Sequence, residues 1–249
     1  MYYSIQENGR TKLDARLIKY EHEITPSSNR RSQIKQAFLQ LKNEGFRLLP
    51  YVDDAKLAGS FALNCMIKSD NLVSVFVYLE PQFSEITPKS IITKLQRDLA
   101  DQFGLSYVCE ATCSVMLKTQ ACEFELIVMM AKHQTVLIAD KHARQWREFS
   151  ARKVGLLLRK ADPQVIQLLK IAKAWQLKHY VSAGSSIGHW LDLLEQLSQV
   201  KSLREGLQIL LQYYQWDDPI YSRFQIQRMD NYQFAQYCKD TLFGSDFPE

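Results

Sequence analysis

The first 140 residues combine two hydrophobic periods. A helix is predicted to begin at Arg30, behind a capping Ser28 or Asn29, because apolar residues then recur about every 3.6 positions. From Leu72 to Leu79 apolar residues instead alternate between two faces, as in a strand with one face toward a core. The same criteria predict a helix at 88–103 and strands at 47–58, 107–118, 122–131 and 135–139. We therefore expect a sheet flanked by helices in this half.

The pattern changes after Asp140, where the period becomes about 3.6 and stays there, so the second half is expected to be helical. Asp162 followed by Pro163 is typical of a helix start. The first residues have no clear period, and we expect a loosely packed segment with at most one strand or short helix. The chain is thus divided into an N-terminal arm (1–29), an α/β lobe (30–140) and a helical lobe (141–249), an α+β architecture.

Composition limits the classes of protein that this chain can belong to. Its 249 residues, 46% of them hydrophobic, can bury a large core. No apolar run reaches the roughly 18 residues of a membrane span and the N-terminus is polar, so we expect a cytoplasmic protein without membrane contact. Five cysteines and five histidines without ligand spacing suggest no metal site. The net charge of +4 permits contact with phosphates but does not require it.

Three motifs carry candidate chemistry. Gly59 and Ser60 form a turn before the strand 72–79, and this pair alone is compatible with an ordinary turn. Glu125 lies on the later strand pattern CEFELIV. Lys173 lies on a helix that is apolar on most sides, so its ammonium needs either a phosphate in a cleft or an acidic partner. Lys170, one turn earlier, is expected to be solvated.

In this order and spacing the motifs resemble the DNA polymerase β-like nucleotidyltransferase superfamily. The stretches GHWLDLLEQL, WDDP and NYQFAQYCKDTL are similar to the helical half of its oligoadenylate synthetase/cGAS/DncV-like branch, and the resemblance covers roughly residues 33–245. It implies a mixed-sheet lobe with flanking helices, followed by an all-helical lobe. It also implies that Gly59, Ser60 and Lys173 bind a nucleotide triphosphate beside strand carboxylates that hold two Mg²⁺ ions.

The sequence departs from this family at the metal site. Leu72 and Ser74 occupy the positions of the two strand aspartates, so only the third carboxylate, Glu125, remains. Neither residue supplies the carboxylate oxygens that Mg²⁺ prefers. We therefore expect a pseudoenzyme with no catalytic residues, no metal and no cofactor. The alternative is an active enzyme with a displaced Mg²⁺ site formed by Asp70, Glu80 and Glu125.

A basic stretch after residue 140 is a second candidate surface. Aromatic Trp146 and Phe149 are interleaved with its cations, which we expect on helices, where they either contact RNA or DNA phosphates or are simply solvated. The cations assigned to nucleic acid are Arg144, Arg147, Arg152 and Lys153. Phe76 and Tyr78 share the strand face of Ser74, where they either stack on a base or pack beneath another part of the chain.

The sequence therefore predicts a catalytically inactive nucleotidyltransferase-fold protein. We expect it to act as a nucleotide-binding, nucleic-acid-binding or scaffold subunit of a larger complex, with another protein subunit as its partner. Two alternatives stay open: the active enzyme with displaced carboxylates, and a pure protein-interaction module that binds no nucleotide.

Overall fold

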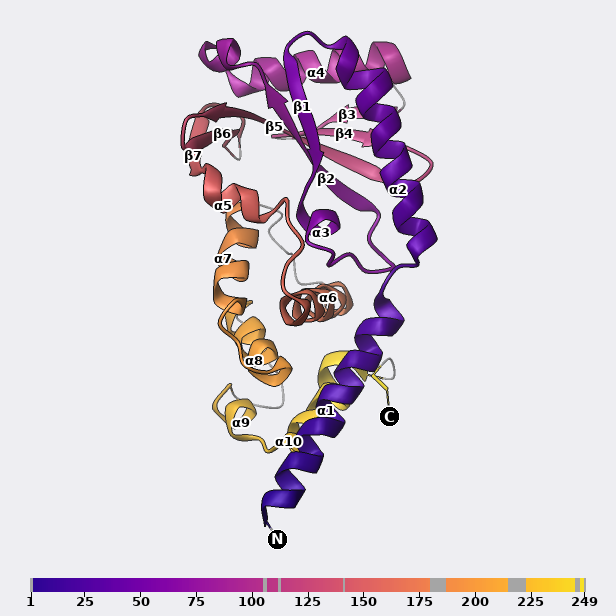
Figure 1. The fold of residues 1–249 in the computed structure, drawn as a ribbon, viewed down its shortest axis with the longest axis vertical. Coiled ribbons are helices and arrows are strands. Elements are labelled where there is room, and N and C mark those ends of the chain that lie inside the picture. Colours follow the sequence, from indigo (N-terminus) through magenta and orange to yellow (C-terminus); the bar gives the residue numbers. More distant parts are fainter. Residues whose placement is uncertain are drawn as a thin grey trace. The chain divides into compact units, whose positions relative to one another are not determined.

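The computed structural model describes residues 2–104, 107–111, 113–140, 142–179, 187–214, 223–244 and 247–248. These residues form two compact units (Figure 1). The sheet unit is Pro26–Lys160, and the helical unit comprises Met1–Thr25 together with Ala161–Glu249. Each unit is described separately.

The sheet unit is built on one mixed sheet. Its central pair, β2 (Leu72–Leu79) and β5 (Glu123–Lys132), is parallel, and every other strand pair that the structure describes is antiparallel. The strand order is β1 (Val52–Leu57), β2, β5, β4 (Val115–Lys118), β3 (Val108–Glu110), and β6 (Thr135–Ala139) joins β5 to β7 (Trp146–Ser150). The predicted sheet is therefore present, with the 107–118 strand divided into a hairpin.

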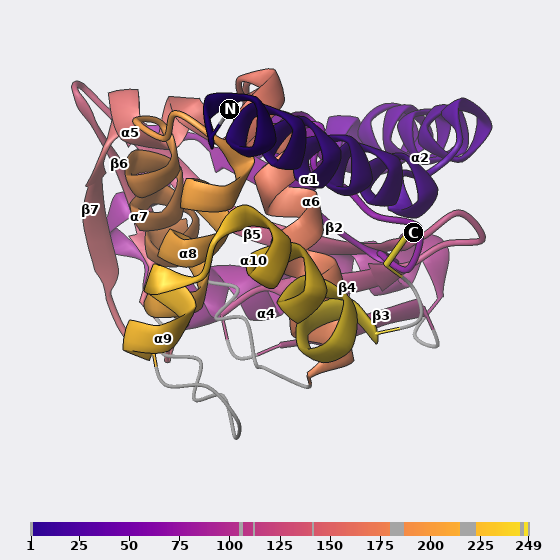
Figure 2. The same ribbon diagram turned by 90° about the horizontal axis from the view of Figure 1, so that it is seen from below.

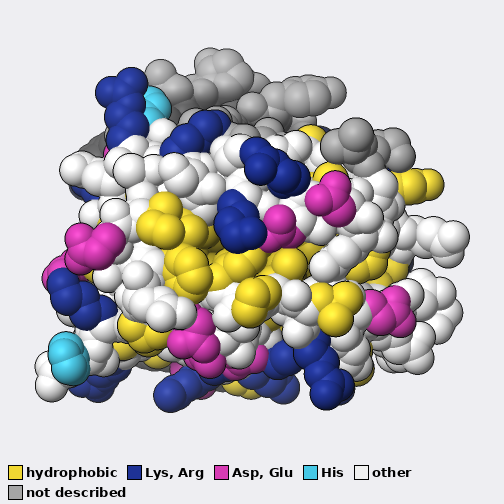
Figure 3. Space-filling view, turned by 90° about the horizontal axis from the view of Figure 1, so that it is seen from above, with side chains coloured by type: hydrophobic (Ala, Val, Ile, Leu, Met, Phe, Trp, Pro, Cys, Tyr) yellow, Lys and Arg dark blue, Asp and Glu magenta, His cyan; other side chains and the backbone are white. Residues whose placement is uncertain are grey.

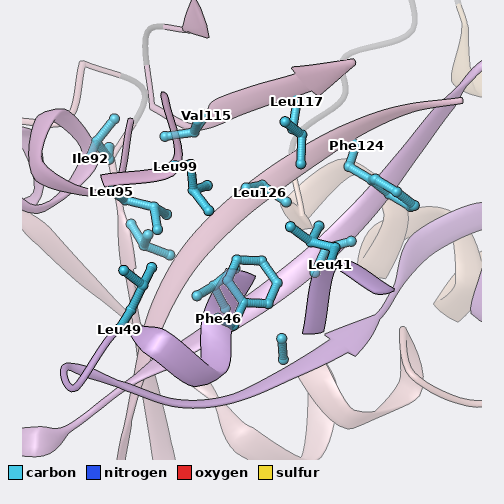
Figure 4. Close-up of a cluster of buried hydrophobic side chains, with 14 of the residues drawn as sticks. Leu41, Phe46, Leu49, Ile92, Leu95, Leu99, Val115, Leu117, Phe124 and Leu126 are labelled. Atoms are coloured by element: carbon cyan, nitrogen blue, oxygen red, sulfur yellow. The ribbon is translucent and has the colours of Figure 1, made fainter. Parts of the chain in front are cut away.

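One face of the sheet is covered by α2 (Ser28–Gln40) and α4 (Pro88–Phe103), which contribute to a single hydrophobic core (Figure 4). On α4 the apolar residues Ile91, Ile92, Leu95 and Leu99 share one side of the helix and are at most 1% exposed. Burial of such side chains stabilises a fold by roughly 1.5–3 kcal/mol each. The Thr87 hydroxyl caps α4 by accepting the Ser90 N–H, which fixes where the helix begins.

The alternation in β2 separates core residues from site residues. Val73, Val75 and Val77 are fully buried in the core cluster. Leu72 and Ser74 therefore lie on the opposite face, and the parallel register places Ser74 directly beside Glu125 of β5. On the molecular face drawn in Figure 3, hydrophobic side chains lie between Lys, Arg, Asp and Glu side chains.

The helical unit begins with α1 (Tyr2–Ile24), which packs against α6 (Pro163–Lys178) and α10 (Asn231–Tyr237) (Figure 2). The unit also contains α7 (Ile187–Leu197), α8 (Leu203–Tyr213), α9 (Arg223–Arg228) and the π-helix η5 (Cys238–Phe243). The expectation of a loosely packed segment with at most a short helix is wrong, since α1 is a long helix whose Leu13 and Leu17 are buried.

The segment after Asp140 also differs from its prediction. Residues 146–150 form β7, whose Arg147 pairs with Ile138 of β6, and α5 (Ala151–Leu156) follows within the sheet unit. The unit boundary therefore falls after Lys160 rather than after Asp140. Backbone pairing with β6 decides the conformation here, because the short sequence WREFS carries no strong strand pattern. None of the described helices is long and apolar enough to cross a membrane.

Candidate functional site

The turn at Gly59 and Ser60 is held against the middle of the sheet. The Ala58 N–H donates to the Ser74 carbonyl at 2.9 Å, and the Gly59 N–H donates to the Leu157 carbonyl at 3.1 Å. Gly59 has a φ of +55°, a conformation that other residues rarely adopt, and a Cβ there would lie 3.5 Å from the Ser74 Oγ. The short helix α3 (Gly59–Ala62) follows, with Ser60 buried. The turn and Ser74 are thus brought together.

Glu125 is held between two serine hydroxyls. The Ser74 Oγ donates to its Oε2 at 3.4 Å, and the Ser114 Oγ donates to its Oε1 at 3.3 Å. Ser114 is 1% exposed and precedes β4, where Met116 lies opposite Glu125. Sequence reasoning missed Ser114, because its contact with Glu125 depends on the antiparallel register of β4 and β5, and no local pattern reports that register.

Burial is the main influence on the electrostatics of Glu125. Burial raises the pKa of Glu125, and the hydrogen bonds from Ser114 and Ser74 lower it only in part. Burial likewise raises the pKa of the nearby Cys113 thiol, and the charges of Glu125 and Asp140 add to that shift. A pair of divalent cations would require the opposite environment, one rich in ionised carboxylates.

The residues at the expected metal positions do not fit a pair of Mg²⁺ ions. Leu72 presents a hydrocarbon side chain that is 41% exposed, and Ser74 presents a neutral hydroxyl already directed at Glu125. This donor set contains one carboxylate, whereas two hard cations need several to neutralise their charge.

The alternative metal site does not assemble either. The Asp70 carboxylate accepts the Ile67 N–H at 3.0 Å inside the turn before β2. Glu80 lies past the other end of β2, six residues beyond Ser74, which corresponds to about 20 Å along a strand. Asp70, Glu80 and Glu125 therefore do not form one cluster. Within the described part of the chain, no group of three or more His, Cys, Asp or Glu residues could hold a metal ion.

The two candidate lysines of α6 have different environments. Lys170 was expected to be solvated, but it is 5% exposed, pairs with Glu21 of α1 and donates to the Thr25 Oγ1 at 2.8 Å. An ion pair with an acidic residue, one of the two options predicted for Lys173, is thus formed by Lys170, one helical turn earlier. Lys173 itself is half-buried in the helical unit, whereas Gly59 and Ser60 belong to the sheet unit. Joint phosphate binding by these three residues stays a prediction.

The basic residues do not share one helix face as expected. Arg144 lies in a turn where its backbone N–H donates to the Asp140 Oδ1 at 2.7 Å, and Arg147 lies on β7. Arg152 and Lys153 belong to α5, and all four cations are exposed. Their assignment to nucleic acid stays a prediction.

The two aromatic residues on the site face of β2 differ in exposure. Phe76 is only 1% exposed, so the predicted stacking on a base is wrong and the alternative, packing beneath another part of the chain, is correct. Tyr78 is half-buried, with the Lys56 ammonium 5.1 Å from its ring centroid.

The chain has the nucleotidyltransferase fold, and Glu125 is the carboxylate of its candidate site that two serine hydroxyls hold. Among solved structures, CdnC of E. coli MS115-1 in complex with HORMA-deltaN is similar, with a TM-score of 0.62 and 13% identity over 95% of this chain and 98% of that chain. The same CdnC with ATP gives a TM-score of 0.62 and 14% identity over 95% and 99%. The CD-NTase CdnG of Bradyrhizobium diazoefficiens in complex with GTP is also similar. Its TM-score is 0.60 and its sequence identity 12%, over 81% of this chain and 74% of that chain.

These likenesses confirm the predicted fold class, an α+β nucleotidyltransferase-type sheet with flanking helices and a set of further helices. They also confirm the resemblance to the cGAS/DncV-like kind of this fold. No protein-family model and no curated protein sequence matches the chain.

Proposed function

We propose that this chain is a non-catalytic nucleotidyltransferase-fold protein that acts by binding, as the nucleotide-binding subunit of a protein complex. One observation carries the proposal: the hydroxyl of Ser74 donates to Glu125 at the position where the fold family places a metal-binding carboxylate. With Leu72 beside it, the site offers a hydroxyl and a hydrocarbon side chain next to a single carboxylate, whereas a cation pair needs several carboxylates. Without charge neutralisation at the phosphates, nucleotidyl transfer has no electrophilic assistance.

Without catalysis, a protein of this fold can still act by binding a nucleotide or a protein partner. CdnC and CdnG were solved with ATP and GTP, and CdnC also with HORMA-deltaN, which supports a nucleotide and a protein partner for this chain. The Gly59 turn lies against Ser74 of β2, which is compatible with the proposed nucleotide site. The apolar side chains gathered on one face of the molecule (Figure 3) are compatible with a protein partner.

The first experiment tests catalysis. Purified protein is incubated with Mg²⁺ or Mn²⁺ and labelled nucleoside triphosphates, with a Glu125→Gln variant as the matched control. We expect no product above that control. Product that is formed by the wild type and lost in Glu125→Gln would refute the proposal and favour an active enzyme.

The second experiment tests nucleotide binding by thermal unfolding with ATP or GTP in EDTA. A ligand at about 100 times its dissociation constant stabilises by roughly 2.7 kcal/mol. We expect Lys173→Glu to remove the shift and Lys201→Glu, an exposed lysine between α7 and α8, to retain it. A wild type that is unmoved by millimolar nucleotide would instead identify a pure protein-interaction module.

A further inference from the structure

A groove of about 780 Å³ opens on the sheet unit between α2 and the turn that joins β4 to β5. It lies away from the candidate site, because its lining contains none of Gly59, Leu72, Ser74 or Glu125. Its volume falls within the range of about 300–1,000 Å³ that is common for small-molecule sites.

One wall of the groove is a stripe of amides. Gln33, Gln36 and Gln40 follow each other at spacings of three and four residues, so they lie on one face of α2. Gln120 contributes a fourth amide from the opposite turn. That turn is tightly held, since the Thr119 N–H and hydroxyl both donate to the Cys122 carbonyl, at 2.9 and 2.7 Å.

The floor and one end of the groove are apolar and well fixed. Leu41 and Leu117 are each 2% exposed and belong to the core cluster (Figure 4). A Cβ on Gly45 would lie 3.1 Å from the Phe103 ring and 3.1 Å from Leu41, so the ring packs closely against the backbone there. The groove thus has a rigid hydrophobic base beneath its polar wall.

Tyr107 completes the groove at the end of α4. Gly104 ends that helix with a φ of +95°, and the Tyr107 N–H donates to the Gly104 carbonyl at 3.1 Å. The tyrosine side chain is 54% exposed although it lines the groove, so its ring is available to a ligand.

The charges of the lining point to the kind of ligand. The lining includes one cation, Lys118 at the rim, and no acidic residue. Glu123, directly opposite Lys118 on β5, is outside the lining. The Gln40 amide already donates to the Glu44 carboxylate at 2.9 Å, so the favourable position for an anionic group is beside Lys118. Side-chain amides pair with the hydrogen-bonding edges of bases, those of adenine above all, and an exposed aromatic ring stacks on any base.

We infer that this groove binds a nucleotide unit, with its base stacked on Tyr107 and hydrogen-bonded by the α2 glutamines and its phosphate near Lys118. The unit is either a free mononucleotide or part of a single strand, since both present the same base and phosphate. The inference is independent of the site at Gly59 and Glu125.

The test is a calorimetric titration of the full chain with AMP, in EDTA. Tyr107→Ser and Gln36→Leu alter exposed side chains, so both variants should fold, which thermal unfolding checks. Each should weaken AMP binding about tenfold or more, because the loss of one stacked base contact in Tyr107→Ser, or of one amide–base pair in Gln36→Leu, has an effect of this size. Gln102→Leu, an exposed amide on α4 outside the groove, should bind AMP as the wild type does.

Two further measurements distinguish a free nucleotide from a single strand, and binding in the groove from binding that depends on Lys173. Tighter binding of an oligoadenylate than of AMP, lost in Tyr107→Ser, would assign the groove to a single strand. Equal binding would assign it to the free nucleotide. Absence of AMP binding at millimolar concentration would overturn the inference. So would binding that survives both groove variants but is lost in Lys173→Glu, and that result would support the proposed function instead.

Discussion

Placing aspartates at Leu72 and Ser74, where the sequence resemblance expects metal-binding carboxylates, is the most direct test of the proposed loss of metal binding. In the variant Leu72→Asp/Ser74→Asp, the Ser74 hydroxyl that donates to Glu125 is replaced by a second negative charge. Two unit charges at the observed 3.4 Å repel by about 5 kcal/mol at an effective dielectric constant of about 20. Since Glu125 is only partly buried, solvent screening reduces this figure to roughly 2–3 kcal/mol.

The double variant should therefore unfold at a lower temperature in EDTA and recover in millimolar Mn²⁺. For a chain of this size, 2–3 kcal/mol corresponds to a shift of roughly 5–10 °C. The wild type should show no such recovery, because its donor set has one carboxylate. Electron paramagnetic resonance of free Mn²⁺ measures the binding directly.

Two controls make the result specific. Leu48→Asp adds a carboxylate at a leucine that is 65% exposed, and it should leave the Mn²⁺ response unchanged. Glu125→Gln in the double variant should weaken the response. A Mn²⁺-dependent rise in the unfolding temperature of the wild type, lost in Glu125→Gln, would refute the reasoning.

Three other predictions concern stability. Lys170→Met leaves the Glu21 carboxylate buried without its partner and should destabilise the chain by about 3–5 kcal/mol in urea unfolding, whereas the added change Glu21→Leu should restore most of that loss. Because burial raises the folded-state pKa of Glu125, its contribution to stability should be fully present below the ordinary carboxyl pKa and be lost as the pH rises through that value toward the raised one. Asp54 and Asp98, whose pKa values are lowered, act in the opposite direction, so the fall is measured as the difference between the wild type and Glu125→Gln. Urea titrations between about pH 4 and about pH 7 should show this fall in the wild type and not in Glu125→Gln. Gly59→Ala should cost about 1 kcal/mol in the same assay, since its φ of +55° is unfavourable for alanine while the new Cβ meets only ordinary contacts.

The elements that sequence predicted well are those whose pattern is local. On α4 the residues Ile91, Ile92, Leu95 and Leu99 mark one side of a helix whatever it packs against. In β2 the alternation from Leu72 onward separates the core face from the site face in the same way. The placement of Ser74 next to Glu125 then follows from parallel pairing of two recognisable strands.

The errors fall where distant contacts decide. In α1 the charged Glu21 is buried because Lys170, 149 residues away, pairs with it, and no pattern within the first 26 residues reports that partner. When Lys170 is not considered, the sequence indicates that Glu21 is a surface residue and that the segment around it is polar. In β7 the residues Trp146–Ser150 become a strand because β6 offers an unpaired edge, although arginine and glutamate favour helices.

The side chains around Glu125 are also what folding without a bound cation would favour energetically. A cluster of carboxylates repels itself unless a cation neutralises it, and the repulsion between neighbours at the Ser74 to Glu125 distance is large on the scale of folding stability. Ser74 and Ser114 convert the same position into a hydrogen-bonded one, in which Glu125 is held by two donors. Leu72, on the same face of β2, adds no charge to the site. In this arrangement Glu125 is satisfied by neutral donors and needs no cation for folding, which agrees with the proposal that the protein acts by binding.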